Sequence, residues 1–426
     1  MRYALTELLR GLGAVPEWAR RDDARLVLAL DGPTPVTHQA LGDLARPRVP
    51  SLDELGWAET DGERWPVAIG PPGAARLADA LASAGWWLAG LQEAAITARD
   101  RHGRVPFDAT LQARLGDAPG GPLRPTVDAL RRLLAATLRQ SGVGVPGRTW
   151  GGAPWAVALT HDLDAVRTRR LRAGLAEVAR GRLADAVRRA LGPDRRRRSM
   201  DELRAMGEKH NARATWFVKP GAWSPEDVAG GLDPALVRRL RAWRGGGHEV
   251  GWHPGYGAHD HPARLATEAE RFGAAFGAPR LARAHFLRWS PATPGLLARH
   301  GVEVDSTMGW SRRPGFRHGT AQPFRLWDAR AERPGLWEVP LAVMDTPLAN
   351  AGLDADAVAA ALRRTFDAAR QSGGVAVVLW HNQLGADTAA WTGRMDALDR
   401  ELGRARAAGA RLGPLGALLD AWTDHP

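Results

Sequence analysis

Short hydrophobic runs that end in polar residues recur along the second part of the chain, with helical patterns between them. Runs of this kind are typical of strands that are buried on both faces of a sheet. We expect strands at 155–162, 214–220, 248–254, 281–289, 302–309, 336–344 and 375–382. Apolar residues that recur every three or four positions predict helices at 199–211, 234–247, 265–277, 293–301 and 355–374.

This alternation of strands and helices favours a parallel sheet covered by helices. About seven such units predict an α/β fold over residues 151–426, most simply a (β/α) barrel. In such barrels the chemistry lies at the carboxyl ends of the strands. The expected strand ends here carry Asp162, Asp164, His253, His285, Asp305 and His381. This agreement indicates an enzyme.

Residues 1–150 have a different character. The expected strands and helices of this part cover 25–30, 65–70, 74–94 and 126–140. Proline and glycine then cluster at 143–154, which predicts a linker. We therefore expect 1–150 to form a small N-terminal α/β accessory domain of unknown role, because it carries no chemical motif.

The amino-acid composition limits the catalytic and metal-binding groups that this protein can use. The chain has no cysteine, which excludes disulfides, thiolate metal sites and a cysteine nucleophile. Any metal must be held by His, Asp, Glu or water. No signal peptide and no apolar run long enough to cross a membrane is recognisable, so the expected location is the cytoplasm.

The positive charge is concentrated in one segment. Residues 167–198 hold twelve arginines and three acidic residues, whereas the whole chain has a net charge of +11. The rest is close to neutral, so no nucleic-acid partner is expected. The segment follows the first expected barrel strand and can contact an anionic membrane surface or glycan; the alternative is a solvated helix.

The first chemical stretch is "LTHDLD" at 159–164. Asp162 and Asp164 are two residues apart, so in an extended chain they face the same side, while His161 faces the other. One carboxylate can then bind a divalent metal while the other acts as a general base. The alternative is a helix cap or turn.

Four histidines lie in "GGHEVGWHPGYGAHDH", at 246–261. His248 and His253 are about 16 Å apart in a strand, so they cannot share one metal ion. His253 lies at the strand end that carries the chemistry, and His248 is expected to be structural. His259 and His261 follow a turn, and each is either a loop histidine or a ligand that folds back.

Two further strand ends carry candidate groups. In "RAHFLRW", Arg283 and His285 share one face of an expected strand, where the cation can orient a carboxylate and the histidine can bind metal. The alternative is a packed histidine paired with other protein groups. In "VVLWHN", His381 is suited to act as a general acid, and Asn382 beside it is a candidate for substrate binding.

Together these four stretches resemble the polysaccharide deacetylases of carbohydrate esterase family 4, over about residues 155–426. The resemblance implies a distorted (β/α) barrel and a divalent metal, usually zinc, held by one Asp and two His. It also implies an Asp base, a His acid and removal of acetyl groups from N-acetylated sugars. The partner would therefore be a carbohydrate substrate.

The resemblance assigns roles to individual residues. Asp162 matches the base and Arg283 the arginine that steadies it. Asp164 and His253 match metal ligands, and His381 matches the acid.

The match includes one departure. "DSTMGW", with Asp305 and Trp310, falls where the family's fourth motif lies. The family's second metal histidine comes four residues after the first, and that position is Gly257 here.

The chain is more similar to a divergent bacterial branch of this family, with the motifs His-Asp-x-Asp, His-Pro-x-Tyr, Arg-x-His-x-Leu-Arg and Trp-His-Asn. "RDRHGRVPFD", at 99–108, resembles the inter-domain region of that branch. The third ligand is then expected to be His285, with His259 as the alternative.

The segment 308–328 is rich in arginine, aromatic residues and glycine, and we expect it to form a loop over the site. Trp310 can stack on a sugar ring, and Arg317 and His318 can bind hydroxyls or acids. Ordinary loop packing is the alternative.

The main hypothesis is a metal-dependent hydrolase that removes an acetyl or other N-acyl group from an N-acetylated sugar or polysaccharide. Two alternatives stay open. One is a catalytically weakened carbohydrate-binding protein of the same fold, and the other is a hydrolase of another acyl amide.

Overall fold

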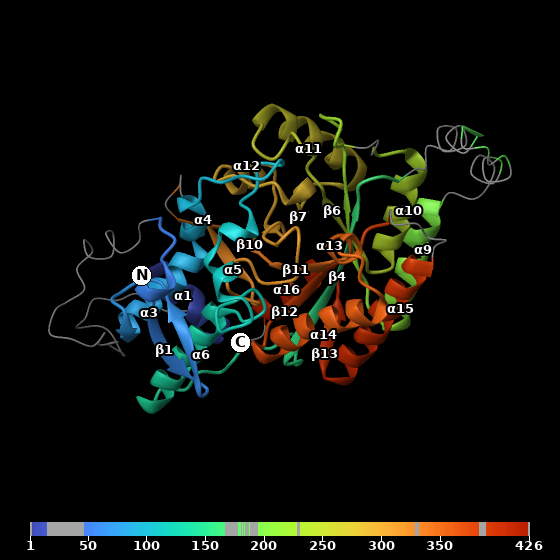
Figure 1. The fold of residues 1–426 in the computed structure, drawn as a ribbon. Coiled ribbons are helices and arrows are strands. Elements are labelled where there is room, and N and C mark those ends of the chain that lie inside the picture. Colours follow the sequence, from blue (N-terminus) through green and yellow to red (C-terminus); the bar gives the residue numbers. More distant parts are fainter. Residues whose placement is uncertain are drawn as a thin grey trace.

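The computed structural model describes residues 2–14, 47–166, 195–227, 231–328, 333–382 and 389–424, with a few single residues between them. A curled, mainly parallel sheet forms a half-barrel with helices on its outside, and the N-terminal region lies beside it (Figure 1). The predicted α/β class is thus confirmed. The expected strand at 25–30 and nearly all of the basic segment 167–198 lie outside the described residues.

The large sheet has the strand order β11-β12-β4-β5-β6-β7-β8-β10-β9, and β13 also pairs with β4. Every pair is parallel except β10–β9. The strands are β4 (Trp155–Leu163), β5 (Thr215–Val218), β6 (Glu249–Trp252), β7 (Leu281–Ala282), β8 (Val304–Asp305), β9 (Phe324–Asp328), β10 (Arg333–Glu338), β11 (Leu341–Met344), β12 (Val375–Leu379) and β13 (Ala410–Gly413). All nine residues of β4 are buried, as expected for a central strand between two layers.

Helices connect the strands, and most of them pack on the outer face of the sheet, whereas the last one packs against Ala156 and Ala158 on the opposite face (Figure 1). They are α9 (Arg195–Lys209), α10 (Pro234–Gly245), α11 (Pro262–Phe276), η4 (His285–Leu287), α12 (Thr293–Ala298), α13 (Asp345–Asn350), α14 (Ala355–Gln371), α15 (Ala389–Ala407) and α16 (Leu415–Asp424). Their starts follow local chemistry. The Asp233 side chain caps α10, whose first residue is proline, and Asp354 caps α14.

The segment 336–344 was expected to be one strand, but it forms the end of β10 and all of β11. Only Val339 and Pro340 separate them, and proline has no N–H with which to continue a ladder. β10 pairs with β8 and β9 near one end of the sheet, whereas β11 pairs with β12 at the other end. A two-residue link between distant strands requires the sheet to curl strongly, so that its ends approach each other.

The expected strand at 281–289 is much shorter than predicted. Only Leu281 and Ala282 pair with neighbouring strands, and the chain then turns into the 3₁₀ helix η4. Phe286 and Leu287 have φ angles of 58° and 55°, in the left-handed region, which no strand can include. His285 is therefore carried by a turn and not by a strand.

The N-terminal region combines a small sheet with several helices. Its elements are α1 (Arg2–Gly11), η2 (Leu52–Glu54), β1 (Gly56–Thr60), β2 (Glu63–Val67), β3 (Gly73–Ala74), α3 (Leu77–Leu88), α4 (Leu91–Ala95), η3 (Phe107–Ala109), α5 (Leu111–Leu115) and α6 (Thr126–Gln140). The hydrophobic core of this region also contains Met308, Phe324 and Leu326 from the barrel part of the chain. The two parts therefore share a core.

Polar contacts strengthen this junction. The carboxylate of Asp128, on α6, accepts hydrogen bonds from Thr320 Oγ1 and the Ala321 backbone N–H, both at 2.7 Å. It also forms a buried ion pair with Arg131.

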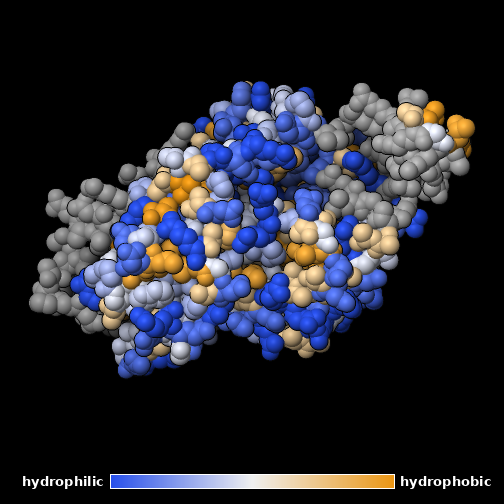
Figure 2. Space-filling model, in the orientation of Figure 1, coloured by the Kyte–Doolittle hydropathy of each residue, from blue (hydrophilic) through white to orange (hydrophobic). Residues whose placement is uncertain are grey.

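Figure 2 shows hydrophilic residues over most of the visible face, with hydrophobic patches over the N-terminal region. In the described part of the chain, no helix has the length and apolar character that crossing a membrane requires.

Replacement of Asp128 by alanine should destabilise the whole protein. It leaves the buried Arg131 guanidinium without its carboxylate, and breaking a buried pair in this way costs about 3–5 kcal/mol. Urea unfolding measures the change. Glu63→Ala is the control, because it removes the largely exposed pair with Arg124 and should cost less than about 1 kcal/mol. Equal stability of the Asp128→Ala and Glu63→Ala proteins would contradict this reading of the junction.

Candidate metal centre

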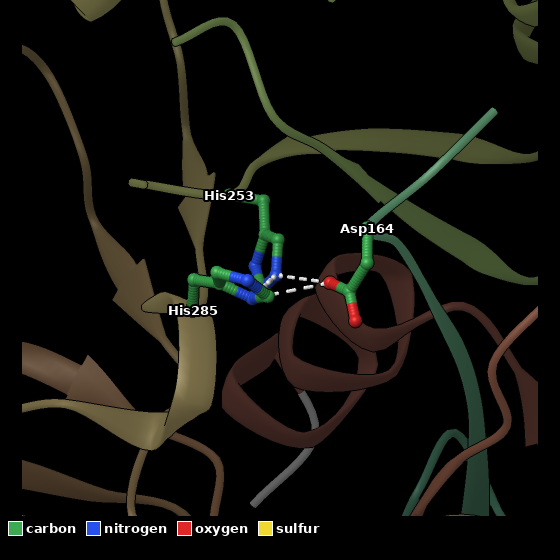
Figure 3. Close-up of side chains that lie close together, drawn as sticks. All are labelled: Asp164, His253 and His285. Atoms are coloured by element: carbon green, nitrogen blue, oxygen red, sulfur yellow. Dashed lines mark hydrogen bonds and ion pairs between the residues drawn. The ribbon is translucent and has the colours of Figure 1, made fainter. Parts of the chain in front are cut away.

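Three side chains from the ends of three strands of one sheet converge on one point. Asp164 follows β4, His253 follows β6 and His285 lies three residues after β7. His253 Nε2 lies 3.1 Å from Asp164 Oδ1 and 3.1 Å from His285 Nδ1, and His285 Nδ1 lies 3.2 Å from Asp164 Oδ1 (Figure 3). Within the described ranges, these three residues form the group of potential ligands close enough to hold one ion.

The geometry fits a small divalent cation. Ligand atoms that lie ~2.1 Å from zinc at tetrahedral angles are roughly 3.4 Å from one another. The three ligand atoms here are separated by 3.1–3.2 Å. Two imidazoles and one carboxylate are also a ligand set that zinc accepts.

Hydrogen bonding fixes which nitrogen of His253 faces this point. Its Nδ1 lies 2.6 Å from the backbone oxygen of Arg283. A carbonyl oxygen can only accept, so Nδ1 carries the proton and Nε2 presents a lone pair to the other two ligands. Burial acts to raise the pKa of Asp164, but the neighbouring imidazoles of His285 and His253 outweigh it and hold the pKa well below its usual range.

Asp162 lies beside the three ligands and is held by Arg283. Arg283 Nη1 donates to Asp162 Oδ1 at 3.1 Å and to Thr160 Oγ1 at 2.7 Å. The same guanidinium donates to the backbone and side-chain oxygens of Ser306, each at 2.9 Å. The second carboxylate oxygen of Asp162 lies 3.9 Å from His253 Nε2. One oxygen is thus anchored while the other faces the metal ligands.

His381 follows β12, which is the neighbour of β4 on the side away from β5, and its side chain approaches the same ligand group. Its Nε2 lies 3.9 Å from Asp164 Oδ2. Its Nδ1 donates to Asp345 Oδ1 at 2.6 Å, and its backbone N–H donates to Asp345 Oδ2 at 3.0 Å. Burial acts to lower the pKa of His381, but Asp345, with smaller contributions from Asp164 and Asp162, raises it to about 10.

Sequence reasoning missed two polar residues beside this centre, Asp345 and Lys219. Asp345 begins α13 directly after β11, and a strand ending in Asp was the available signal. Lys219 follows β5 and is fully buried, with Nζ 3.4 Å from His285 Nε2 and 3.3 Å from Asp227 Oδ1. Lys219 is one of only two lysines in the chain, and its position after an apolar run was the signal.

The other histidines of 246–261 lie apart from the three ligands. His248 directly precedes β6, at the opposite end of the strand from His253, and its Nδ1 accepts from Ala214 N and Trp216 Nε1. His261 caps α11 by accepting from Arg264 N at 3.4 Å. His259 is buried, with Nδ1 3.4 Å from the Asp260 carboxylate, and is not part of the ligand group.

Gly257 has no room for a side chain without rearrangement. A β-carbon there would meet Arg264 Nη1 at 2.5 Å, and this nitrogen donates to the Gly257 backbone oxygen at 2.9 Å. Arg264 Nη1 therefore occupies the space beside the position that carries a histidine in the resembled family, and His285, from another segment, completes the candidate ligand group.

The expected substrate-binding residues of 308–328 are buried against the N-terminal region. Trp310 Nε1 donates to Gln112 Oε1 at 3.0 Å. Arg317 forms a buried ion pair with Glu93, and His318 Nδ1 lies 3.0 Å from the Trp87 backbone oxygen. These contacts correspond to the loop-packing alternative, because the polar groups that would bind a sugar have partners inside the protein.

Asn382 and Asp305 are also occupied by internal contacts. Asn382 Nδ2 donates to the backbone oxygen of Ala165 at 3.0 Å, while its side-chain oxygen is buried without a hydrogen bond. Asp305 Oδ1 accepts from Thr307 Oγ1 at 2.6 Å. Burial raises the pKa of Asp305 to about 6, against smaller effects from Thr307 and Arg283.

No protein-family model and no curated protein matches the sequence. Two similar solved structures have low sequence identity to this chain. A protein provisionally named a polysaccharide deacetylase, from Mycobacterium smegmatis, is 18% identical with a TM-score of 0.39; the match covers 61% of this chain and 93% of that one. PuuE allantoinase is 13% identical with a TM-score of 0.44, over 64% of this chain and 91% of that one. Likeness at this level assigns no activity.

The purified protein should bind one divalent ion through Asp164, His253 and His285. Loss of one ligand should weaken zinc binding by more than about tenfold, since even residues that only support a ligand have effects of that size. Equilibrium dialysis of zinc with wild-type, Asp164→Ala and His285→Ala proteins measures this. The His259→Ala protein should bind zinc like the wild type. Weakened binding there, with unchanged binding in His285→Ala, would reverse the choice of third ligand.

Proposed function

We propose that this protein is a metal-dependent hydrolase that removes an acetyl or other N-acyl group from an N-acetylated sugar or polysaccharide. The observation that carries the proposal is the convergence of three separate units on one edge of the sheet. These are the ligand group of Asp164, His253 and His285, the Asp162–Arg283 pair and the His381–Asp345 pair. The sugar as substrate class is supported by the sequence resemblance.

Asp164, His253 and His285 would hold the ion. When bound, a divalent cation supplies Lewis-acid chemistry that polarises a carbonyl group and makes water more acidic. Zinc suits the two nitrogen ligands and one oxygen ligand best. The protein's own contribution is to place a proton acceptor, Asp162, and a proton donor, His381, beside this centre.

Asp162 is the general base in this proposal. Arg283 holds one of its oxygens, so the other can accept the proton of the attacking water without the carboxylate rotating away. Because Arg283 is itself fixed by Thr160 and Ser306, the geometry of the base is set before substrate binds.

His381 is the general acid. Asp345 accepts the Nδ1 proton, which leaves Nε2 as the nitrogen that can deliver a proton to the leaving amine. Asp345 also accepts the His381 backbone N–H, so the ring and its backbone are held by the same carboxylate. This arrangement supports protonation of the amine as the carbon–nitrogen bond of the amide breaks.

Asp162→Asn should abolish most of the activity while leaving metal binding intact. An amide cannot take the proton of water, and general bases contribute about 10²–10⁴-fold to rates. The assay is mass-spectrometric detection of acetyl loss from a panel of N-acetylated monosaccharides and oligosaccharides, extended to other acyl amides. Asp260→Asn, an exposed carboxylate nearby, is the control and should retain full activity. Full activity of Asp162→Asn would refute the assignment of the base.

Asp345→Asn should also lower kcat by at least about 10²-fold. The hydrogen bond from His381 Nδ1 to an amide oxygen is weaker than the one to a carboxylate, so the ring is held less firmly. The value of KM should change little, since Asp345 is fully buried. Steady-state kinetics on the substrate found with the panel measures both constants. A variant with an unchanged kcat would show that His381 acts without this partner.

A further inference from the structure

The turn that carries His285 adopts a conformation that its own sequence disfavours. Phe286 and Leu287 follow the ligand directly, and both have φ angles near +55°, at 58° and 55°. Residues with a β-carbon rarely adopt this region, so contacts from elsewhere must hold the turn. The His285 backbone N–H donates to the Pro254 oxygen at 2.9 Å, which fixes one side of the turn.

The other side is held by a short turn of the N-terminal region. Arg104 Nη1 donates to the backbone oxygen of Phe286 at 2.8 Å. Asp100 in turn accepts from Arg104 Nε and Nη2, at 2.9 and 2.7 Å. The other Asp100 oxygen accepts the backbone N–H groups of His102 and Arg104, at 2.9 and 3.0 Å. One carboxylate therefore closes the turn and orients the guanidinium.

Ring contacts accompany this hydrogen bond. The His102 ring lies 4.5 Å from the Phe286 ring, which lies 4.6 Å from the His285 ring, both measured between centroids. His102 Nδ1 also lies 3.2 Å from the Tyr256 hydroxyl. Tyr256 comes three residues after His253 in sequence, so the same turn contacts the segments of two metal ligands.

We propose that the Asp100–Arg104 turn is a positioning element of the metal centre, so that metal affinity depends on the N-terminal region. The inference rests on the proposed role of His285 as a ligand. Arg104 acts through the Phe286 backbone and His102 through the Phe286 ring, and neither touches the ion. Without them the strained turn can relax, and His285 Nδ1 no longer points at Asp164 and His253.

The test uses the full chain and two metal probes. Zinc affinity is measured by competition with a chromophoric chelator, and Co²⁺ is added to record the visible absorption of the substituted centre. Arg104→Ala should weaken zinc binding by about tenfold or more and change the Co²⁺ spectrum. Arg104→Lys retains one donor for the Phe286 oxygen and should recover part of the affinity.

Arg124→Ala is the matched control, because Arg124 lies in the same region and hydrogen-bonds the partly exposed Glu63. It should bind zinc like the wild type. Wild-type affinity and spectrum in Arg104→Ala, or an equal loss in Arg124→Ala, would overturn the inference. If Arg104→Ala does not fold, His102→Ala decides by the same criteria. A wild-type protein that binds no divalent ion would instead refute the proposed function itself.

Discussion

The hydrogen bond from His253 Nδ1 to the backbone oxygen of Arg283 connects most parts of the candidate site. It selects the tautomer of one ligand and ties the end of β6 to the segment after β7. The side chain of the same Arg283 holds Asp162, and two residues further on the chain presents His285. A shift of this backbone oxygen would therefore move a ligand, disturb the base and misplace a second ligand together.

Parallel register explains why these contacts are available. Thr160 pairs with Thr215, Thr215 with Glu249 and Trp252 with Ala282, so neighbouring strands end at similar heights. Their carboxyl ends form one edge, where side chains distant in sequence become neighbours. Asp162, Asp164, His253 and His381 could be placed on this edge from sequence because each follows or ends an apolar run. The end of an apolar run is a local feature of the sequence, so the hydrophobic pattern alone is enough to locate these residues.

The rest depends on contacts that sequence does not display. His285 was placed on a strand, yet left-handed residues after it and contacts from the N-terminal region set its position. The polar residues of 308–328 have the composition of a sugar-binding loop, but Glu93 and Gln112 lie where a ligand was expected. Burial of a polar loop by another part of the chain leaves no mark on that loop's own sequence. Pro340 can be seen in the sequence, but only the pairing of β11 with β12 shows that the chain passes there from one end of the sheet to the other.

The position of β4 also has a consequence for folding. This strand is buried throughout and carries Asp162, yet its partners β12 and β13 begin at Val375 and Ala410. During synthesis, one edge of this apolar strand and the first half of the other edge stay without partners until nearly the whole chain has left the ribosome. Such long-range pairing slows folding and exposes strand edges to aggregation. Loss of β13, which carries no residue of the candidate site, should therefore disturb the central strand that carries Asp162.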